Sequence, residues 1–205
     1  YRQSAEIILI IFSNYLDILN PIVFLKIKKF LFLKKSSFTK GIAPPSTFLV
    51  KTNTLKRENK IVFLGRFDTQ KGVKSILNII PDLSKYLEQK EIKYKIDFIG
   101  EGDLLKEIQK VQKSINKNFL EIRIYSSDNI IKDIKKAKIF LSVQDYSNYP
   151  SRSLTEAMCL GLIPLVSDTG ESRLMLPYNY PYLLDYKNLE DELLRSLQTI
   201  IIMKE

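Results

Sequence analysis

Short apolar runs alternate with stretches of helical spacing along most of the chain. Five of the runs predict β-strands, and they are Ile61–Leu64, Tyr94–Ile99, Leu120–Tyr125, Ile139–Val143 and Ile163–Val166. A sixth run, Ile7–Phe12, stands apart near the start. Apolar residues recur every three or four positions over Val73–Leu87 and Leu104–Ile115, which is typical of helices with one buried face. Pro81 predicts a kink or a restart in the first of these helices, with Ile80 as the boundary.

The alternation of strands and helices predicts the fold class. Strands separated by helices of this length form βαβ units, in which right-handed crossovers build a parallel sheet. The polar stretch Pro44–Lys60 begins with two prolines and has few apolar residues, so we interpret it as a linker. The chain is therefore predicted to hold a doubly wound α/β domain over residues 61–205, a linker over 44–60, and the tail of another domain over 1–43.

Composition narrows the chemistry that the chain can perform. The chain has 205 residues, of which 45% are hydrophobic, and this is enough to bury a core. It contains no histidine, which excludes a triad, a general base or a metal site built on that residue within this chain. A single cysteine, Cys159, excludes an internal disulfide and a Cys-rich zinc site. We interpret it as a core residue on a buried helix face, because no base is available to activate its thiol.

Positive charge is concentrated at the start of the chain. The net charge is +9, and residues 1–60 hold 11 Lys and Arg against 3 Asp and Glu, whereas residues 61–205 hold 21 against 20. The excess is densest at Lys26, Lys28, Lys29, Lys34, Lys35 and Lys40. It fits a peripheral membrane contact through the basic, apolar stretch 22–35, a phosphate-bearing ligand or a solvated surface. No nucleic acid is expected as a partner, because no recognised nucleic-acid module accompanies the charge.

Neither a spanning segment nor a signal peptide is expected. No run reaches the roughly 18–20 apolar residues that a spanning helix needs, and no basic region or cleavage site frames Ile7–Phe12. The chain begins at Tyr1, almost directly before that run, so we interpret it as a piece of a longer polypeptide. The expected location is the cytoplasm, either free or at the inner face of a membrane.

The ends of the predicted strands carry the residues best suited to binding. In doubly wound sheets, ligands bind beyond the carboxyl ends of the strands, next to helix N-termini. Gly65, Arg66 and Lys71 follow the first strand of the domain. The glycine permits a close backbone approach, and the two cations precede a helix N-terminus, which together suit a diphosphate. A solvated turn with two surface cations is the alternative interpretation.

Two glycines follow the second strand of the domain. Gly100 and Gly102 mark a tight turn, and Asp103 is the predicted N-cap of the next helix. The third glycine of the dinucleotide fingerprint is missing from this turn. NAD and FAD are therefore disfavoured as ligands.

A carboxylate stands near the start of the helix after the fourth strand. Glu156 is predicted to lie in the first turns of this helix, where a carboxylate can accept hydrogen bonds from a vicinal diol such as a ribose. The alternative is a capping box, in which Ser153 is the N-cap and Glu156 reaches back to it from three residues further on.

Taken in order, these segments resemble the C-terminal, donor-binding domain of the GT-B glycosyltransferases, specifically the retaining group 1 (family 4-like) enzymes. The resemblance covers residues 60–176 and rests on FLGRFDTQKGVKSIL, DFIGEGDLLKEI and YPSRSLTEAMCLGLIPLVSDTGE. The first residues are similar to the strand, serine and helix that close the family's acceptor domain, in AEIILIIFSNYLDIL. The resemblance implies a Rossmann-like doubly wound parallel sheet, one half of a GT-B fold, preceded by the tail of a second domain.

The resemblance also implies a reaction and roles for single residues. Arg66 and Lys71 would stabilise the leaving nucleotide diphosphate as the glycosidic bond breaks, and Glu156 would bind the ribose hydroxyls. The donor would further contact Gly65, Gly100, Gly102, Asn148, Ser151 and Arg152. The implied partners are a nucleotide-diphosphate sugar and a glycan or lipid-linked glycan acceptor, with retention at the transferred sugar. Neither a metal nor another cofactor is expected, and this fragment alone should bind the donor but hardly transfer sugar.

One residue departs from the family's pattern. Asn148 stands eight residues before Glu156, where the family usually has a second glutamate that touches the donor sugar. Either the sugar is held differently, with altered selectivity, or the domain is impaired. A degenerate nucleotide-binding or interaction domain and a sugar-nucleotide epimerase therefore stay open as alternatives. A response-regulator-like domain is a third, although the chain lacks the acidic cluster that it needs.

Overall fold

The chain divides into two compact units, Tyr1–Ala43 and Pro44–Glu205. The computed structural model describes residues 15–18, 24–25, 35–38 and 56–203. The predicted strand Ile7–Phe12, the basic residues 26–34 and most of the predicted linker lie outside the described residues.

Two short strands are described in the first unit. They are β1 (Tyr15–Ile18) and β2 (Lys35–Phe38), and they pair in parallel. The expectation of a helix after Ser13 is therefore wrong for the residues of β1. Four residues are too few to separate a helical pattern from an extended one, and pairing with β2 supplies hydrogen-bond partners to the backbone of β1.

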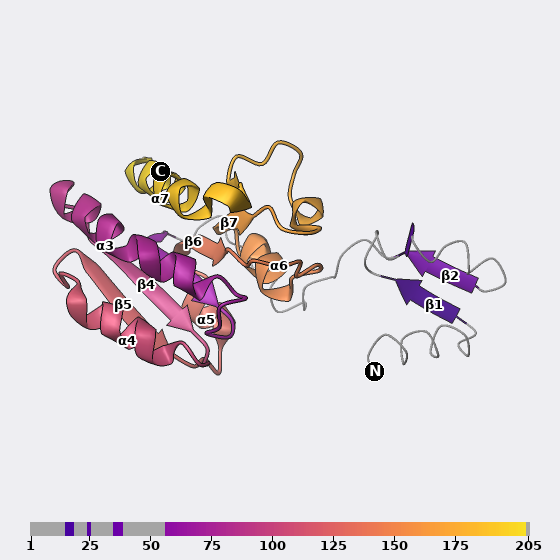
Figure 1. Ribbon diagram of the computed structural model, residues 1–205, viewed down its shortest axis with the longest axis horizontal. Helices are drawn as coiled ribbons and strands as arrows, with labels where there is room; N and C mark the ends of the chain where they lie inside the picture. Colours follow the sequence, from indigo (N-terminus) through magenta and orange to yellow (C-terminus); the bar gives the residue numbers. More distant parts are fainter. Residues whose placement is uncertain (1–14, 19–23, 26–34, 39–55, 204–205) are drawn as a thin grey trace. The chain divides into compact units, whose positions relative to one another are not determined.

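The second unit is built around a six-stranded parallel sheet (Figure 1). Its strands are β3 (Glu58–Leu64), β4 (Tyr94–Ile99), β5 (Leu120–Tyr125), β6 (Ala137–Ser142), β7 (Ile163–Ser167) and β8 (Leu183–Leu184). They stand in the order β5-β4-β3-β6-β7-β8, and each neighbouring pair is parallel. The order reverses between β3 and β6, so this pair is the topological switch point of a Rossmann-like, doubly wound sheet. The predicted fold class is confirmed.

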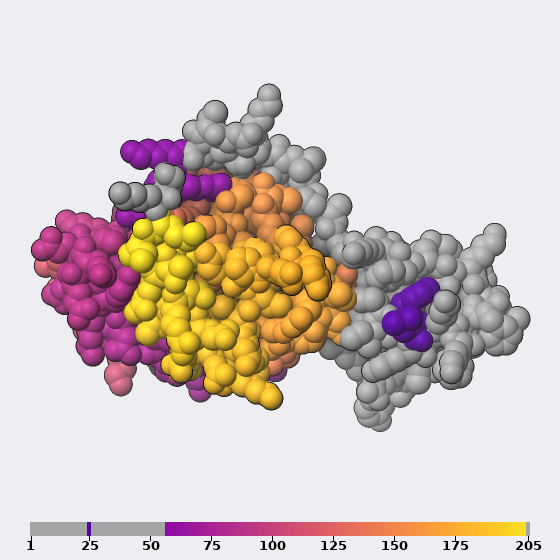
Figure 2. Space-filling view, turned by 90° about the horizontal axis from the view of Figure 1, so that it is seen from above, coloured from indigo at the N-terminus to yellow at the C-terminus, as the bar shows by residue number. Residues whose placement is uncertain are grey.

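Helices cover both faces of the sheet. One face packs against α3 (Val73–Gln89), α4 (Leu105–Ser114) and α7 (Leu189–Ile202), and the other against α5 (Ile130–Ile134) and α6 (Arg152–Cys159) (Figure 1). Two short 3-10 helices, η3 (Ser172–Met175) and η4 (Tyr186–Asn188), flank β8. Figure 2 shows α7 (yellow) beside the segment that follows β7 (orange) on one face of this unit. Within the described residues, no helix combines the length and the apolar character that crossing a membrane requires.

The apolar runs of the strands are buried on both sides. In β3, Ile61 and Phe63 belong to the core under α3, α4 and α7, whereas Val62 belongs to the core under α5 and α6. Neighbouring residues of a strand point to opposite faces, so a continuous apolar run fits a parallel sheet with helices on both sides. This is the physical reason why these strands could be predicted from their sequence.

The predicted strand boundaries are close to those of the structure. β4 and β5 have the predicted bounds, and β7 extends one residue further, to Ser167. β3 begins at Glu58, so the predicted linker is three residues too long. β6 covers Ala137–Ser142 instead of Ile139–Val143, and β8 was not predicted.

Helix α3 runs through Pro81 without interruption, so the predicted boundary at Ile80 is wrong. Pro81 lies on the exposed side of the helix, whereas Ile76, Ile80 and Leu83 are fully buried against the sheet. A proline inside a helix removes one backbone hydrogen bond and strains the preceding turn. Burial of the apolar face outweighs this local cost.

The position of Pro81 leads to a stability prediction. Pro81→Ala is expected to raise the free energy of unfolding by about 1–3 kcal/mol, because alanine restores the backbone hydrogen bond and has the higher helix propensity. Urea unfolding followed by circular dichroism measures the change. Asp82→Ala, at the next exposed position of the same helix, is the control. Equal or lower stability of Pro81→Ala would mean that stiffening of the unfolded chain by proline dominates.

Candidate functional site

A cavity of about 520 Å³ opens at the carboxyl ends of β3 and β6. Its lining comprises Phe63, Leu64, Gly65, Lys71, Ile130, Leu141, Ser142, Gln144, Asn148, Pro150, Arg152, Ser153 and Glu156. These residues come from the two strands, the loops that follow them, the start of α5 and the first turns of α6. The cavity therefore lies at the switch point, where open α/β sheets bind their ligands.

Five of the nine predicted binding residues line this cavity. They are Gly65, Lys71, Asn148, Arg152 and Glu156. The other four, Arg66, Gly100, Gly102 and Ser151, do not belong to its lining. The structure thus brings together residues from two predicted segments, after β3 and after β6, that are far apart in the sequence.

Lys71 is fixed at the start of α3. Its main-chain N–H donates to Asp68 Oδ1 at 2.8 Å, and Gly72 is the N-cap of the helix with φ 72°. A Cβ at residue 72 would lie 1.7 Å from the main-chain oxygen of Val143, so only glycine allows α3 to begin this close to the end of β6. The Lys71 ammonium lies 5.4 Å from the centre of the Tyr146 ring, a cation–π distance.

The N-terminus of α3 adds to the positive charge beside Lys71. The first turn of the helix contains no acidic residue. The Asp68 carboxylate, which lies just before the helix, accepts from the Lys71 N–H and pairs with Arg66, so the N–H groups of the first turn and the positive end of the helix dipole stay available. A lysine followed directly by a helix N-terminus favours an anion such as a phosphate.

Arg66 lies outside the cavity lining. Its guanidinium is 3.2 Å from the carboxylate of Asp68, and 71% of its side chain is exposed. An exposed ion pair contributes about 0–1 kcal/mol. Arg66 can therefore leave Asp68 for another anion at small cost.

The turn after β4 packs against the backbone of Gly65. A Cβ at Gly100, which has φ 140°, would lie 2.1 Å from the main-chain oxygen of Gly65. The two turns thus touch backbone to backbone. The predicted N-cap Asp103 is wrong: the cap of α4 is Leu104, whose N–H donates to the main-chain oxygen of Phe67 at 2.9 Å. A backbone contact replaces the side-chain cap at this helix.

Ser151 is the N-cap of α6. Its Oγ accepts a hydrogen bond from the N–H of Leu154 at 3.4 Å. The capping-box alternative with Ser153 as the N-cap is therefore wrong. Glu156 lies five residues after the actual cap, beyond the position from which a side chain reaches back to the cap.

Glu156 is a buried carboxylate that faces the cavity. Only 3% of the residue is exposed, and its Oε1 accepts a hydrogen bond from Arg152 Nε at 2.8 Å. Burial of a carboxylate without a charged or hydrogen-bonding partner is costly, so Arg152 stabilises it. No described residue donates a hydrogen bond to Oε2, which leaves this oxygen for a ligand hydroxyl.

Sequence reasoning did not predict three polar residues of the cavity lining, Ser142, Gln144 and Ser153, as binding residues. Ser142 and Gln144 are buried, and their side chains form no hydrogen bond with another described residue. Both lie at the carboxyl end of β6, next to the switch point. The sequence feature that could have indicated Ser142 and Gln144 is the change from apolar to polar residues at the end of β6.

The loop that carries Asn148 is tied to the segment after β7. Ser167 Oγ donates to the main-chain oxygen of Gln144 at 2.5 Å, and Thr169 Oγ1 donates to that of Tyr146 at 3.3 Å. Ser147 Oγ donates to the carboxylate of Glu171. These bonds hold the loop and place Asn148 in the cavity lining.

The described residues were also compared with what a metal site or a reactive thiol requires. Over residues 56–203 and the short described segments before them, no group of three or more Cys, Asp and Glu side chains could hold a metal ion. Cys159 is half-buried and packs against the core under α5 and α6.

Comparison with known sequences identifies the family. The sequence profile described as glycosyl transferases group 1 matches residues 47–197. The chain belongs to the group 1 glycosyltransferases. An uncharacterized glycosyltransferase of Methanocaldococcus jannaschii, MJ1069, is 28% identical to this group 1 chain over 153 residues, which are 71% of the chain and 37% of the relative.

Solved structures of other glycosyltransferases share the fold. An E. coli structure described as trehalose-6-phosphate bound with UDP-2-fluoro glucose matches 94% of this chain with a TM-score of 0.65 and 12% identity. The pneumococcal O-GlcNAc transferase GtfA, in complex with UDP and GlcNAc, matches 92% with a TM-score of 0.57 and 13% identity. This chain covers 54% and 38% of those two chains. The resemblance to the C-terminal, Rossmann-like domain of GT-B glycosyltransferases is thereby confirmed.

Proposed function

We propose that the cavity binds a nucleotide-diphosphate sugar and that the full-length protein transfers the sugar, with retention, to a glycan or lipid-linked glycan. The observation that carries this proposal is the meeting of Lys71, the N-terminus of α3 and Glu156 at one cavity of the switch point. A cation and a helix N-terminus suit a diphosphate, and a buried carboxylate with a free oxygen suits a diol.

Charge stabilisation is the proposed role of Lys71 and Arg66. As the glycosidic bond breaks, negative charge grows on the leaving diphosphate, and fixed positive groups lower the energy of that state. Lys71 already lines the cavity, and Arg66 reaches the diphosphate after it leaves Asp68. No metal is needed in this proposal, because these cations and the helix dipole supply the positive charge.

Recognition of the donor is the proposed role of the remaining residues. Glu156 Oε2 accepts hydrogen bonds from the ribose hydroxyls while Arg152 holds the other oxygen. Asn148 hydrogen-bonds the transferred sugar, and the backbone around Gly65 and Ser151 lines the nucleotide. Uracil is the first base to test, because the two similar structures above contain UDP or a UDP-sugar.

The acceptor of the sugar, the cellular location of the protein and its contact with a membrane are predictions from the sequence. The chain spans 37% of the length of its curated relative, so the acceptor site is proposed to lie mainly outside it. This chain alone is expected to bind donor but to transfer hardly any sugar. A cytoplasmic location and a membrane contact through residues 22–35 rest on the sequence, and most of that stretch lies outside the described residues.

Thermal unfolding with a panel of nucleoside diphosphates tests the proposal. A ligand at 100 times its dissociation constant is expected to stabilise the chain by about 2.7 kcal/mol, or roughly 5–10 °C in Tm. The shift should occur with one nucleotide and be lost in both Arg66→Ala and Lys71→Ala. No shift with any nucleotide would contradict the donor site. Binding without turnover in the full-length protein would favour the degenerate domain, which the Asn148 departure also suggests.

A further inference from the structure

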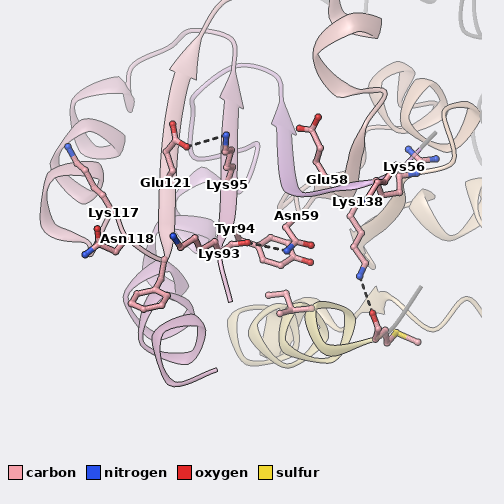
Figure 3. A pocket seen from close by; sticks show the side chains of 14 residues that line it. Lys56, Glu58, Asn59, Lys93, Tyr94, Lys95, Lys117, Asn118, Glu121 and Lys138 are labelled. Carbon is pink, nitrogen blue, oxygen red and sulfur yellow. Dashed lines mark hydrogen bonds and ion pairs between the residues drawn. The ribbon is translucent and has the colours of Figure 1, made fainter. Parts of the chain in front are cut away.

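A second hollow lies at the opposite, amino edge of the sheet (Figure 3). It encloses about 610 Å³. Its lining comprises Lys56, Arg57, Glu58, Asn59, Lys93, Tyr94, Lys95, Lys117, Asn118, Phe119, Glu121, Lys138, Ile201 and Met203. The seven residues of β3 run from this edge to the cavity described above, and a strand of that length spans roughly 20 Å. The two sites are therefore separate.

Positive charge dominates the lining of this amino-edge hollow. It contains six cationic residues and two carboxylates, Glu58 and Glu121. Both carboxylates already have a lysine partner: Glu121 lies 3.5 Å from Lys95, and Glu58 lies 3.8 Å from Lys136. Neither carboxylate is left to balance the other cations of the hollow.

Four lysines of the hollow are not neutralised by a carboxylate. Lys56, Lys93 and Lys117 are exposed, and no Asp or Glu of the described residues lies within ion-pair distance of them. Lys138 Nζ donates to the main-chain oxygen of Met203 at 3.2 Å, which is a neutral acceptor. Figure 3 labels these four lysines among the side chains that line the hollow.

The four lysines form a row set by the sheet. Lys93 directly precedes β4, Lys56 stands two residues before β3, and Lys117 stands three residues before β5. Lys138 is the second residue of β6. These strands are consecutive neighbours in the sheet. Since neighbouring strands are about 4.8 Å apart, the row extends over roughly 14 Å. One phosphate reaches two such positions at most, whereas a chain of phosphates reaches all of them.

We propose that this row binds a ligand with several phosphate groups, separate from the sugar-nucleotide site. Residues 44–205 carry 25 Lys and Arg against 21 Asp and Glu, so the excess over the whole unit is small and the positive charge of the hollow is a local concentration. Lysine ammonium groups bind phosphate as point charges without a fixed geometry. The ligand is either a free oligophosphate or the head group of a polyphosphorylated lipid, and both present the same chemistry to the row.

Titration calorimetry with tripolyphosphate at low ionic strength tests the proposal. The full chain with Lys71→Ala serves as background, so that the donor cavity does not contribute. Adding Lys56→Ala, Lys93→Ala and Lys117→Ala is expected to weaken binding about fivefold for each lysine, or about 100-fold together. The matched control replaces three exposed lysines of α4, Lys106, Lys110 and Lys113, with alanine. It removes the same charge elsewhere and is expected to change affinity by less than about twofold.

Vesicle flotation separates the two sources of phosphate. One sample holds phosphatidylcholine with phosphatidylinositol 4,5-bisphosphate, and the other phosphatidylcholine alone. Flotation with the first sample that is lost in the amino-edge triple variant assigns a lipid head group. Tripolyphosphate binding without such flotation assigns a free oligophosphate. Equal tripolyphosphate affinity in the background and the amino-edge variant, or equal losses in the α4 control, would overturn the proposal, whatever the donor cavity binds.

Discussion

Lys71→Ala is expected to lower the kcat of sugar transfer by the full-length protein by about 10²–10³-fold, the effect of removing one preorganised group that stabilises developing charge. The Lys71 ammonium lines the cavity, and its backbone is fixed by Asp68 and by the tight contact of Gly72 with Val143. The group is therefore already in place before the reaction, and no other lysine of the described residues lines this cavity.

The matched control for this experiment is Lys74→Ala. Lys74 lies three residues further along the same helix, is exposed and does not line the cavity. Its removal changes the net charge equally but is expected to leave kcat within about twofold, because an exposed charge at a distance is screened. Steady-state kinetics with the donor identified by thermal unfolding measures both variants. A similar loss in both would indicate a general electrostatic effect and contradict the assigned role.

Asp97→Ala is expected to lower the free energy of unfolding by about 3–5 kcal/mol, as is typical when one partner of a buried ion pair is removed. Asp97 is fully buried in β4. It accepts hydrogen bonds from Arg123 Nε at 2.7 Å and from the Tyr125 hydroxyl at 2.8 Å, and Lys60 Nζ lies 3.7 Å away. Because Lys60 is itself only 5% exposed, the substitution leaves a buried ammonium without its counter-charge.

Glu121→Ala is the matched control on the same face of the sheet. Glu121 pairs with Lys95 at 3.5 Å, but 48% of its side chain is exposed. Loss of an exposed pair is expected to cost less than about 1 kcal/mol. Urea unfolding at neutral pH measures both variants. In the unsubstituted chain, burial and the hydrogen bond to Asp97 raise the pKa of Tyr125 above its usual range, and the protonated hydroxyl donates to Asp97. Equal effects of the two substitutions would contradict the importance of the buried cluster.

The strands of the sheet could be predicted because their apolar runs are buried from both faces. The bounds of β4 and β5 followed directly from such runs. β8, with only Leu183 and Leu184, is too short to carry a pattern and exists through its pairing with β7. The preference of proline for helix ends could not predict that α3 continues past Pro81. The helix continues because residues distant in the sequence pack against its apolar face.

The part of the candidate site that could be predicted is the set of residues whose positions follow from the sheet topology. Residues just after strands meet at one edge of a parallel sheet, so Gly65, Lys71, Asn148, Arg152 and Glu156 could be expected together. Details of side-chain pairing were not accessible in this way. Ser151 and Ser153 both precede an apolar helical pattern, so the sequence alone does not show which is the N-cap of α6. The path of the chain before the helix makes Ser151 the N-cap. Likewise, the contact of Arg66 with Asp68 depends on the shape of one turn.

The order of the strands also has a consequence for synthesis of the chain on the ribosome. β3, β4 and β5 are consecutive in the chain and neighbours in the sheet, so this half can pair once Tyr125 has left the exit tunnel. Val62 and Ile99, however, are covered by α5, α6 and β6, which are made later. A nascent chain of intermediate length therefore displays an apolar sheet face, and exposed surface of this kind is what chaperones shield from aggregation.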